Sequence, residues 1–271
     1  MLKAGSQTAG LSYFVNAFPL FENAPLYGRL VLPQNNCMQK FIAIILILCL
    51  PVVTRAHSYW IETTGSHKPG EPVTVKLYFG EYAGREIMTG KALDKMKDIA
   101  MYVQLGTAKT PITMTQADSC WTGTFTPATE GSYEITGIND VREVQDWTKH
   151  NLGIVRPVQY LKHIYQAGTR QTPRPANAFL DLQFQKEAEG HYNITIFKNG
   201  LRQPATRVVI TRPDGEDTIL ETDASGKLNY KAPEAGLYMV IVEWIDKTPG
   251  RFKEKDYATT RHRLDFSFYN Q

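Results

Sequence analysis

The sequence lacks an excess of charge of either sign once its first 56 residues are set aside. Four basic residues stand there against one acidic residue, namely Lys3, Arg29, Lys40 and Arg55 against Glu22. The whole chain has 30 basic and 27 acidic residues, so 26 of each remain from His57 onward. Binding of nucleic acid depends on clustered positive charge. A neutral body without a basic stripe therefore argues against nucleic acid as a partner.

The sequence also lacks an apolar run long enough to span a membrane comfortably. Its longest run, from Phe41 to Val53, has 13 residues, whereas a transmembrane helix needs about 20. A lysine precedes this run and small residues follow it, which is the order found in a secretory signal peptide. We therefore interpret residues 38–56 as a signal peptide cleaved after Ala56, and residues 1–37 as an upstream extension foreign to the native chain. The mature protein is then periplasmic or secreted and has no integral membrane segment.

Cysteine is scarce, and cleavage would remove most of it. Cys37 and Cys49 lie before Ala56, and only Cys120 follows it. A single cysteine cannot form an internal disulfide, and no Cys pair is available for a structural zinc site. Cys120 stands beside Trp121 in a strand-like stretch, where we expect a small buried apolar residue.

Motifs of enzymatic chemistry are absent as well. The chain has no Ser, His and Asp order with a nucleophile elbow, no phosphate-binding glycine loop and no paired carboxylates at recognisable motif positions. We therefore expect a protein that is not an enzyme.

Alternation of apolar and polar residues is the dominant pattern of the mature chain. Residues 73–79 and 99–105 alternate strictly, as buried strands do. Residues 120–126 and 132–138 flank a turn-rich segment at 127–131, which predicts a hairpin. The sequence predicts an all-β fold made of antiparallel sandwiches.

A change of composition predicts a domain boundary at residues 171–178. This segment, QTPRPANA, combines prolines with small and polar residues, as linkers do. Turns every 8 to 12 residues follow it, separated by short β-prone runs, and the last run, 261–268, has an apolar face. We expect two immunoglobulin-like β-sandwiches in series, at 57–170 and 179–271, with residues 158–167 forming a strand of the first.

Several passages together resemble a known family. They are AHSYWIE at 56–62 and most of 190–268, including HYNITIFKNG, TDASGKLNYKAP and DYATTRHRLDFSF. They resemble secreted bacterial proteins of a domain-of-unknown-function family that is labelled the periplasmic component of cobalt or nickel uptake systems. The second sandwich alone is similar to carboxypeptidase-regulatory-like domains, which are informative about fold and uninformative about function.

Cleavage after Ala56 would place three nitrogen ligands at one point of the chain. His57 would carry a free α-amine, its imidazole and the following amide nitrogen. An α-amine has a pKa of about 7.7 to 8.0, so protons compete only weakly with a metal there. Copper and nickel favour such nitrogen ligands. The resemblance, in which histidine commonly follows the cleavage site, strengthens a metal role for His57, although an incidental histidine past a cleavage point stays open.

Five further histidines could supply a second ligand: His67, His150, His163, His191 and His262. We favour His262, because it shares a strand face with apolar residues and lies within the resembling passage. A core histidine bound to a backbone carbonyl is the competing interpretation of His262. His67 lies in a turn-like segment and is expected to be exposed.

These observations leave three hypotheses of function open. The first is a periplasmic accessory protein that binds nickel, cobalt or copper and presents it to a membrane metal transporter. The second is a non-catalytic β-sandwich module that binds a protein or glycan partner. The third is a copper redox enzyme with an N-terminal histidine site, for which the sequence shows no clear substrate surface.

Overall fold

A computed structural model of the protein describes residues 57–170 and 176–270. Every described residue belongs to one compact unit. The predicted upstream extension and signal peptide therefore lie outside the described residues, as does most of the predicted linker. None of the helices in the described part is long and apolar enough to cross a lipid bilayer.

The described residues form strands arranged in four sheets, with two short 3-10 helices. Sheet A contains β1 (Ser58–Thr64), β2 (Val73–Glu81), β3 (Glu86–Ile87), β6 (Thr115–Gln116) and β7 (Trp121–Phe125). Sheet B contains β4 (Ala100–Leu105), β5 (Ala108–Pro111), β8 (Gly131–Asn139), β9 (Gln145–Trp147), β10 (Gly153–Ala167), β14 (Arg207–Thr211), β15 (Asp217–Glu221), β17 (Gly236–Asp246) and β20 (Thr259–Asn270). Sheet C contains β11 (Leu180–Ala188), β12 (His191–Lys198), β13 (Leu201–Arg202) and β16 (Lys227–Lys231). Strands β18 (Gly250–Phe252) and β19 (Lys255–Tyr257) pair as a hairpin, and the helices are η1 (Gly90–Met96) and η2 (Thr148–His150).

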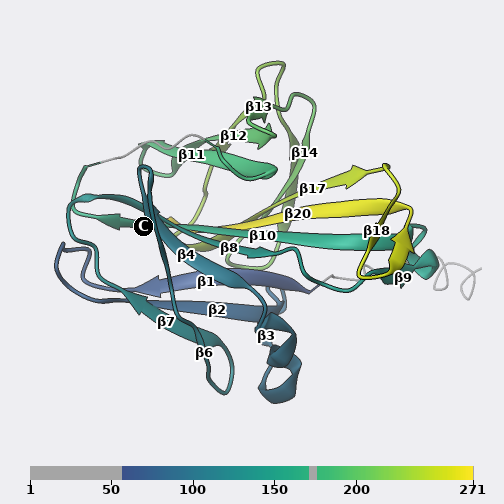
Figure 1. Ribbon diagram of the computed structural model, residues 1–271. Helices are drawn as coiled ribbons and strands as arrows, with labels where there is room; N and C mark the ends of the chain where they lie inside the picture. The colour runs from purple at the N-terminus through teal and green to yellow at the C-terminus, as the bar shows by residue number, and fades with distance from the viewer. Residues whose placement is uncertain (1–56, 171–175, 271) are drawn as a thin grey trace, which may run out of the picture. The chain divides into compact units, whose positions relative to one another are not determined.

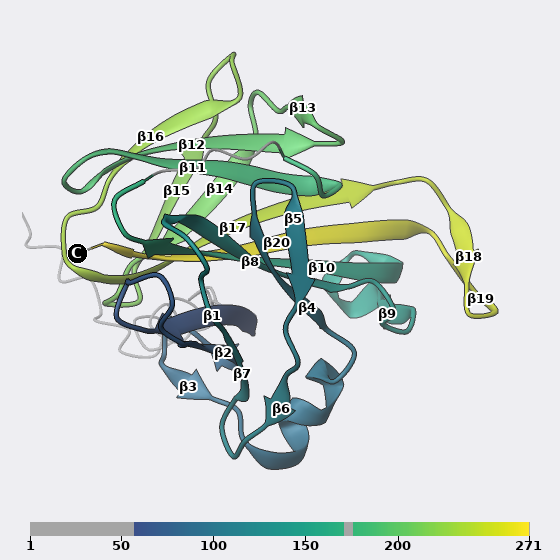
Figure 2. The same cartoon turned by 60° about the vertical axis from the view of Figure 1, so that its left-hand side comes forward.

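Sheet B is the middle of three layers, with sheets A and C on its opposite faces (Figure 1 and Figure 2). One apolar core fills the space between sheet A and strands β4, β8 and β10. The other fills the space between sheet C and strands β10, β14, β17 and β20. The all-β sandwich class predicted from alternation is therefore confirmed.

Strands β10 and β20 join the two sandwiches. They pair in parallel from Val155 opposite Thr259 to His163 opposite Ser267. Successive side chains of a strand point to opposite faces. On β10, Tyr160 packs in the core beneath sheet C and Leu161 in the core beneath sheet A. Because one sheet serves both cores, the two sandwiches are continuous through this pair of strands.

The predicted strands are largely present. The runs at 73–79 and 99–105 correspond to β2 and β4, and the run at 158–167 lies within the longer β10. The predicted final strand corresponds to β20, whose Leu264, Phe266 and Phe268 lie in the core beneath sheet C as expected. Cys120 is buried, also as expected. The domain boundary at 171–178 stays a prediction, because 171–175 is not described.

The hairpin predicted at 120–138 is wrong. Both strands exist, but β7 pairs with β2 and β6 in sheet A, while β8 pairs with β4 and β10 in sheet B. The turn at 127–131 therefore crosses from one layer of the sandwich to the other. A turn has a similar composition whether it joins two strands of one sheet or connects two sheets, so the local sequence did not distinguish these arrangements.

Candidate functional site

His57 lies at the surface, directly before the first strand. Its ring is exposed and stacks on Phe79 of β2, with 5.2 Å between ring centroids and 19° between planes. The next four residues, Ser58 to Ile61, are buried. The chain therefore enters the body of the protein immediately after His57, which fixes where that residue is presented.

A buried polar network holds the start of β1 against β20. The Arg263 guanidinium donates from Nη2 to Ser58 Oγ at 2.7 Å and from Nε to Asp265 Oδ1 at 2.7 Å. The other oxygen of Asp265 accepts from the Tyr59 backbone N–H at 3.1 Å and from Gln159 Nε2 at 3.0 Å. Charge-assisted hydrogen bonds of this kind have strict geometry. They therefore set the position of His57, one residue before Ser58.

The Phe79 ring on which His57 stacks also carries a cation. The Lys95 ammonium stands 3.8 Å from the centroid of the Phe79 ring. Burial, together with the nearby charge of Arg142, lowers the pKa of Lys95. Among the described residues, no group of three His, Cys, Asp or Glu side chains is placed to hold a metal ion. A metal at His57 would therefore not be enclosed by a preformed cluster of such ligands.

His262 occupies a buried position beneath sheet C. Its ring stacks on Phe179 at 3.9 Å between centroids, and its Nδ1 lies 3.0 Å from the Tyr160 hydroxyl. Burial lowers the pKa of His262 to about 4, and the charge of Asp246 opposes this effect only in part. The ring is thus neutral at physiological pH and held among aromatic side chains.

The structure does not bring His57 and His262 together. Ser58 binds Arg263, whose side chain lies on the face of β20 toward sheet A. His262 is the next residue along the strand, so it points to the opposite face, toward sheet C. Strand β20 has neighbours on both sides in sheet B, which leaves the sheet between the two histidines. The expected pair of ligands therefore has no support in this geometry.

The remaining histidines divide into three exposed residues and one buried residue. His67, His150 and His191 are exposed, as expected for His67. His163 is almost fully buried, with Nδ1 3.0 Å from Ser267 Oγ and Nε2 3.0 Å from Thr63 Oγ1.

The protonation of His163 follows from its neighbours. Ser267 donates its hydroxyl proton to the Ile61 carbonyl at 2.6 Å, so Nδ1–H of His163 must donate to Ser267 and Nε2 must accept from Thr63. Burial lowers the pKa of His163 to about 4. The imidazole is therefore a poor base at neutral pH, and its bonds tie β1 to β10 and β20.

A cavity of about 770 Å³ lies where β10 and β20 diverge. Their pairing ends at His163 and Ser267, after which β10 continues along β8 and β20 continues along β17. The rings of Phe184, Tyr192 and Phe268 line one wall, and Thr63, His163 and Tyr269 line another. In this part of β10 the Gln166 carbonyl lies 2.8 Å from Nδ1 of His67. No sequence pattern indicates this cavity, because it forms between strands that are about 100 residues apart in the chain.

Comparison with known proteins leaves the family open. No protein-family model and no curated protein matches the chain. Among solved structures, the D0-D1 domain of intimin is 10% identical, with 79% of this chain and all of that chain covered at a TM-score of 0.22. A Bacteroides ovatus SGBP-B from a mixed-linkage glucan utilization locus, solved with a heptasaccharide, is 13% identical, with 78% of this chain and 61% of that chain covered at a TM-score of 0.15. At these TM-scores neither likeness supports a conclusion about function.

Proposed function

We propose that the protein is a periplasmic or secreted accessory protein that binds a divalent transition metal, and that His57 holds the metal as the first residue of the mature chain. The observation that carries the proposal is the exposed His57 ring directly before four buried, firmly bonded residues. Cleavage before His57 would leave its α-amine and its imidazole together at the surface. Copper and nickel are the ions that such nitrogen ligands favour, with cobalt following in the affinity order.

The surroundings of His57 favour transfer of the metal over permanent storage. The described residues contain no cluster of three His, Cys, Asp or Glu side chains that could enclose the ion, so a metal held by His57 would keep open coordination positions. The Lys95 ammonium lies over the Phe79 ring on which His57 stacks, and its positive charge opposes a bound cation. A partner with further ligands, such as a membrane metal transporter, could therefore take the ion from this site.

The experiment that tests this proposal has two parts. Mass spectrometry of the exported protein should give His57 as the first residue. Titration with Cu(II) and Ni(II), followed by calorimetry, should then show one site that is lost in His57→Ala and after selective acetylation of the α-amine. His191→Ala is the matched control, since His191 is also exposed but lies in sheet C. Equal affinity in all four samples would overturn the proposal.

A specific observation favours a second candidate function, that of a non-catalytic binding module. The cavity between the diverging ends of β10 and β20 presents strand edges that an extended peptide of a partner protein could pair with. Bound peptide would slow hydrogen exchange of the amides at 164–166 and 268–270. A metal at His57 would leave those amides unchanged, which separates the two functions.

A further inference from the structure

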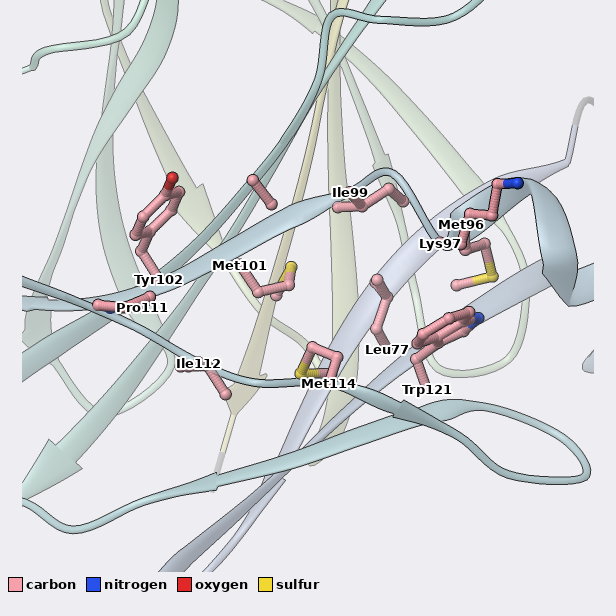
Figure 3. Close-up of a pocket in the computed structure, with 11 residues that line it drawn as sticks. Leu77, Met96, Lys97, Ile99, Met101, Tyr102, Pro111, Ile112, Met114 and Trp121 are labelled. Atoms are coloured by element: carbon pink, nitrogen blue, oxygen red, sulfur yellow. The ribbon is translucent and has the colours of Figure 1, made fainter.

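A second cavity, inside the sandwich of sheets A and B, is lined by methionine side chains. It measures about 210 Å³, and Met96, Met101, Met114 and Trp121 are among its walls. The chain has five methionines after residue 56, and these three, together with Met88, pack in this one core. Figure 3 shows Met101 and Met114 on one side of Leu77, and Met96 beside Trp121 on its other side.

Two of the methionine sulfur atoms pack directly against glycines. A Cβ at Gly137 of β8 would come within 2.6 Å of the Met101 sulfur, and a Cβ at Gly123 of β7 within 2.6 Å of the Met114 sulfur. Such distances are far below van der Waals contact, so any other residue at these positions would displace the thioethers. Strand β8 belongs to sheet B and β7 to sheet A. The glycines therefore make room for one thioether against each layer of the sandwich, next to the same cavity.

The chemistry of the lining selects a particular class of ion. The side chains around the cavity include three thioethers and no carboxylate or imidazole, and the one charged residue, Lys97, is exposed. Thioethers are soft, uncharged ligands that favour Cu(I) over hard divalent ions such as magnesium or calcium. The indole of Trp121, which is held by a 3.0 Å hydrogen bond from Nε1 to the Leu93 carbonyl, adds an aromatic surface that attracts cations.

We propose that this cavity binds one monovalent copper ion through the sulfur atoms of Met101 and Met114, with Met96 and Trp121 enclosing it. Methionine has three rotatable bonds, so modest rotation of these side chains can bring both sulfurs to the ion. The site uses none of the ligands of His57. It therefore goes beyond the function proposed above, and either site can exist without the other.

Titration with a monovalent probe tests the site directly. Silver(I) is used as a redox-inert probe in chloride-free buffer, and Cu(I) is measured by anaerobic competition with bicinchoninate. The purified protein is compared with Met101→Leu, Met114→Leu and the double variant, because leucine conserves volume and removes the sulfur. The matched control is Met239→Leu, at a buried methionine of β17 that does not line this cavity.

We expect each single substitution at 101 or 114 to weaken silver binding roughly tenfold or more, as loss of a metal ligand does. Met239→Leu and His57→Ala should bind silver as the unchanged protein does. Spectra of protein labelled with ¹³C at the methionine methyls should show silver shifting Met101 and Met114 and leaving Met239 in place, which also reports that each variant is folded.

Three results would overturn the site. They are unchanged silver affinity in the folded double variant, absence of silver and Cu(I) binding in the unchanged protein, and loss of binding in His57→Ala alone. The last would place the monovalent ion at the N-terminal residue. Conversely, loss of Cu(II) binding in His57→Ala with silver binding retained would support both sites, and loss of silver binding in the methionine variants alone would support this one.

Discussion

The two faces of strand β20 are both buried, but they are held by different interactions. Toward sheet C, Leu264, Phe266 and Phe268 pack against aromatic and aliphatic side chains. Toward sheet A, Arg263 and Asp265 form a hydrogen-bonded network with the first residues of β1. Apolar burial is strong but tolerant of direction, whereas the polar network accepts only one placement of its partners. One face of β20 thus packs in the apolar core, and the other face holds the first residues of β1 in position.

The largest loss of stability is expected from a substitution on the apolar face of β20. Phe266 is fully buried and lies 4.9 Å from Phe184 between ring centroids. Phe266→Ala should lower the free energy of unfolding by roughly 3 to 5 kcal/mol, because it removes buried apolar area and leaves a cavity. Chemical denaturation followed by circular dichroism measures the loss. The control is Ile219→Ala on the edge strand β15, where the side chain is 60% exposed and the change should stay within about 0.5 kcal/mol. Equal losses in both variants would contradict the comparison.

A comparable or slightly smaller loss is expected on the polar face. Asp265→Ala leaves the buried Arg263 guanidinium with only the exposed Glu243 carboxylate, 3.7 Å from Nη1. Breaking a buried pair costs about 3 to 5 kcal/mol, and Glu243 places the expected loss toward the lower end. The double variant Arg263→Met with Asp265→Leu removes both charges and should recover part of that loss, while the buried Tyr59 N–H and Gln159 amide still lack their acceptor. Denaturation of the single and double variants measures the difference. If the double variant is no more stable than Asp265→Ala, the cost arises from packing and not from the unpaired charge.

The third prediction concerns two buried histidines, whose contribution to stability depends on pH and is smaller for each residue. His262 lies on the apolar face and His163 beside the polar one, and the folded state holds the pKa of each near 4, against about 6.5 in the unfolded chain. The unfolded state therefore binds more protons between pH 6.5 and 4, so stability falls as pH is lowered through this window and stops falling below it. We expect a loss on the order of 3 kcal/mol for the fully enclosed His163 and a smaller loss for His262, whose charge solvent partly screens.

Glutamine variants separate the two contributions to that pH dependence. His262→Gln and His163→Gln should each flatten the fall in stability between pH 6.5 and 4, when unfolding is measured in denaturant across that range. A variant whose slope matches that of the unchanged protein would show that its histidine already titrates normally in the folded state.

The strands were predictable because their pattern is local. Alternation identified β2, β4 and β20 with errors of a few residues at the ends. Pairing was not predictable in the same way. β7 and β8 are adjacent in sequence and belong to different sheets, and which edge a strand meets depends on the whole arrangement of the core.

The candidate sites also differ in how far they depend on local sequence and on distant contacts. The exposed position of His57 agrees with its place just after the expected cleavage point. The expectation that His262 would be its partner rested on a shared apolar face, and that same face turns His262 away from His57. The methionine cavity was missed because Met101 and Met114 come near Gly137 and Gly123 only when sheets A and B pack together.

The sequence by itself determined the all-β class, most strand positions and the apolar face of β20, since each depends on periodicity within a few residues. Only the tertiary structure decided that the second face of β20 is also buried. Arg263, Asp265 and Ser267 look like solvent-facing residues in the sequence, and β1 covers them from about 200 residues away. Polar residues can be buried when distant partners satisfy their hydrogen bonds, and the identity of those partners is a property of the folded chain.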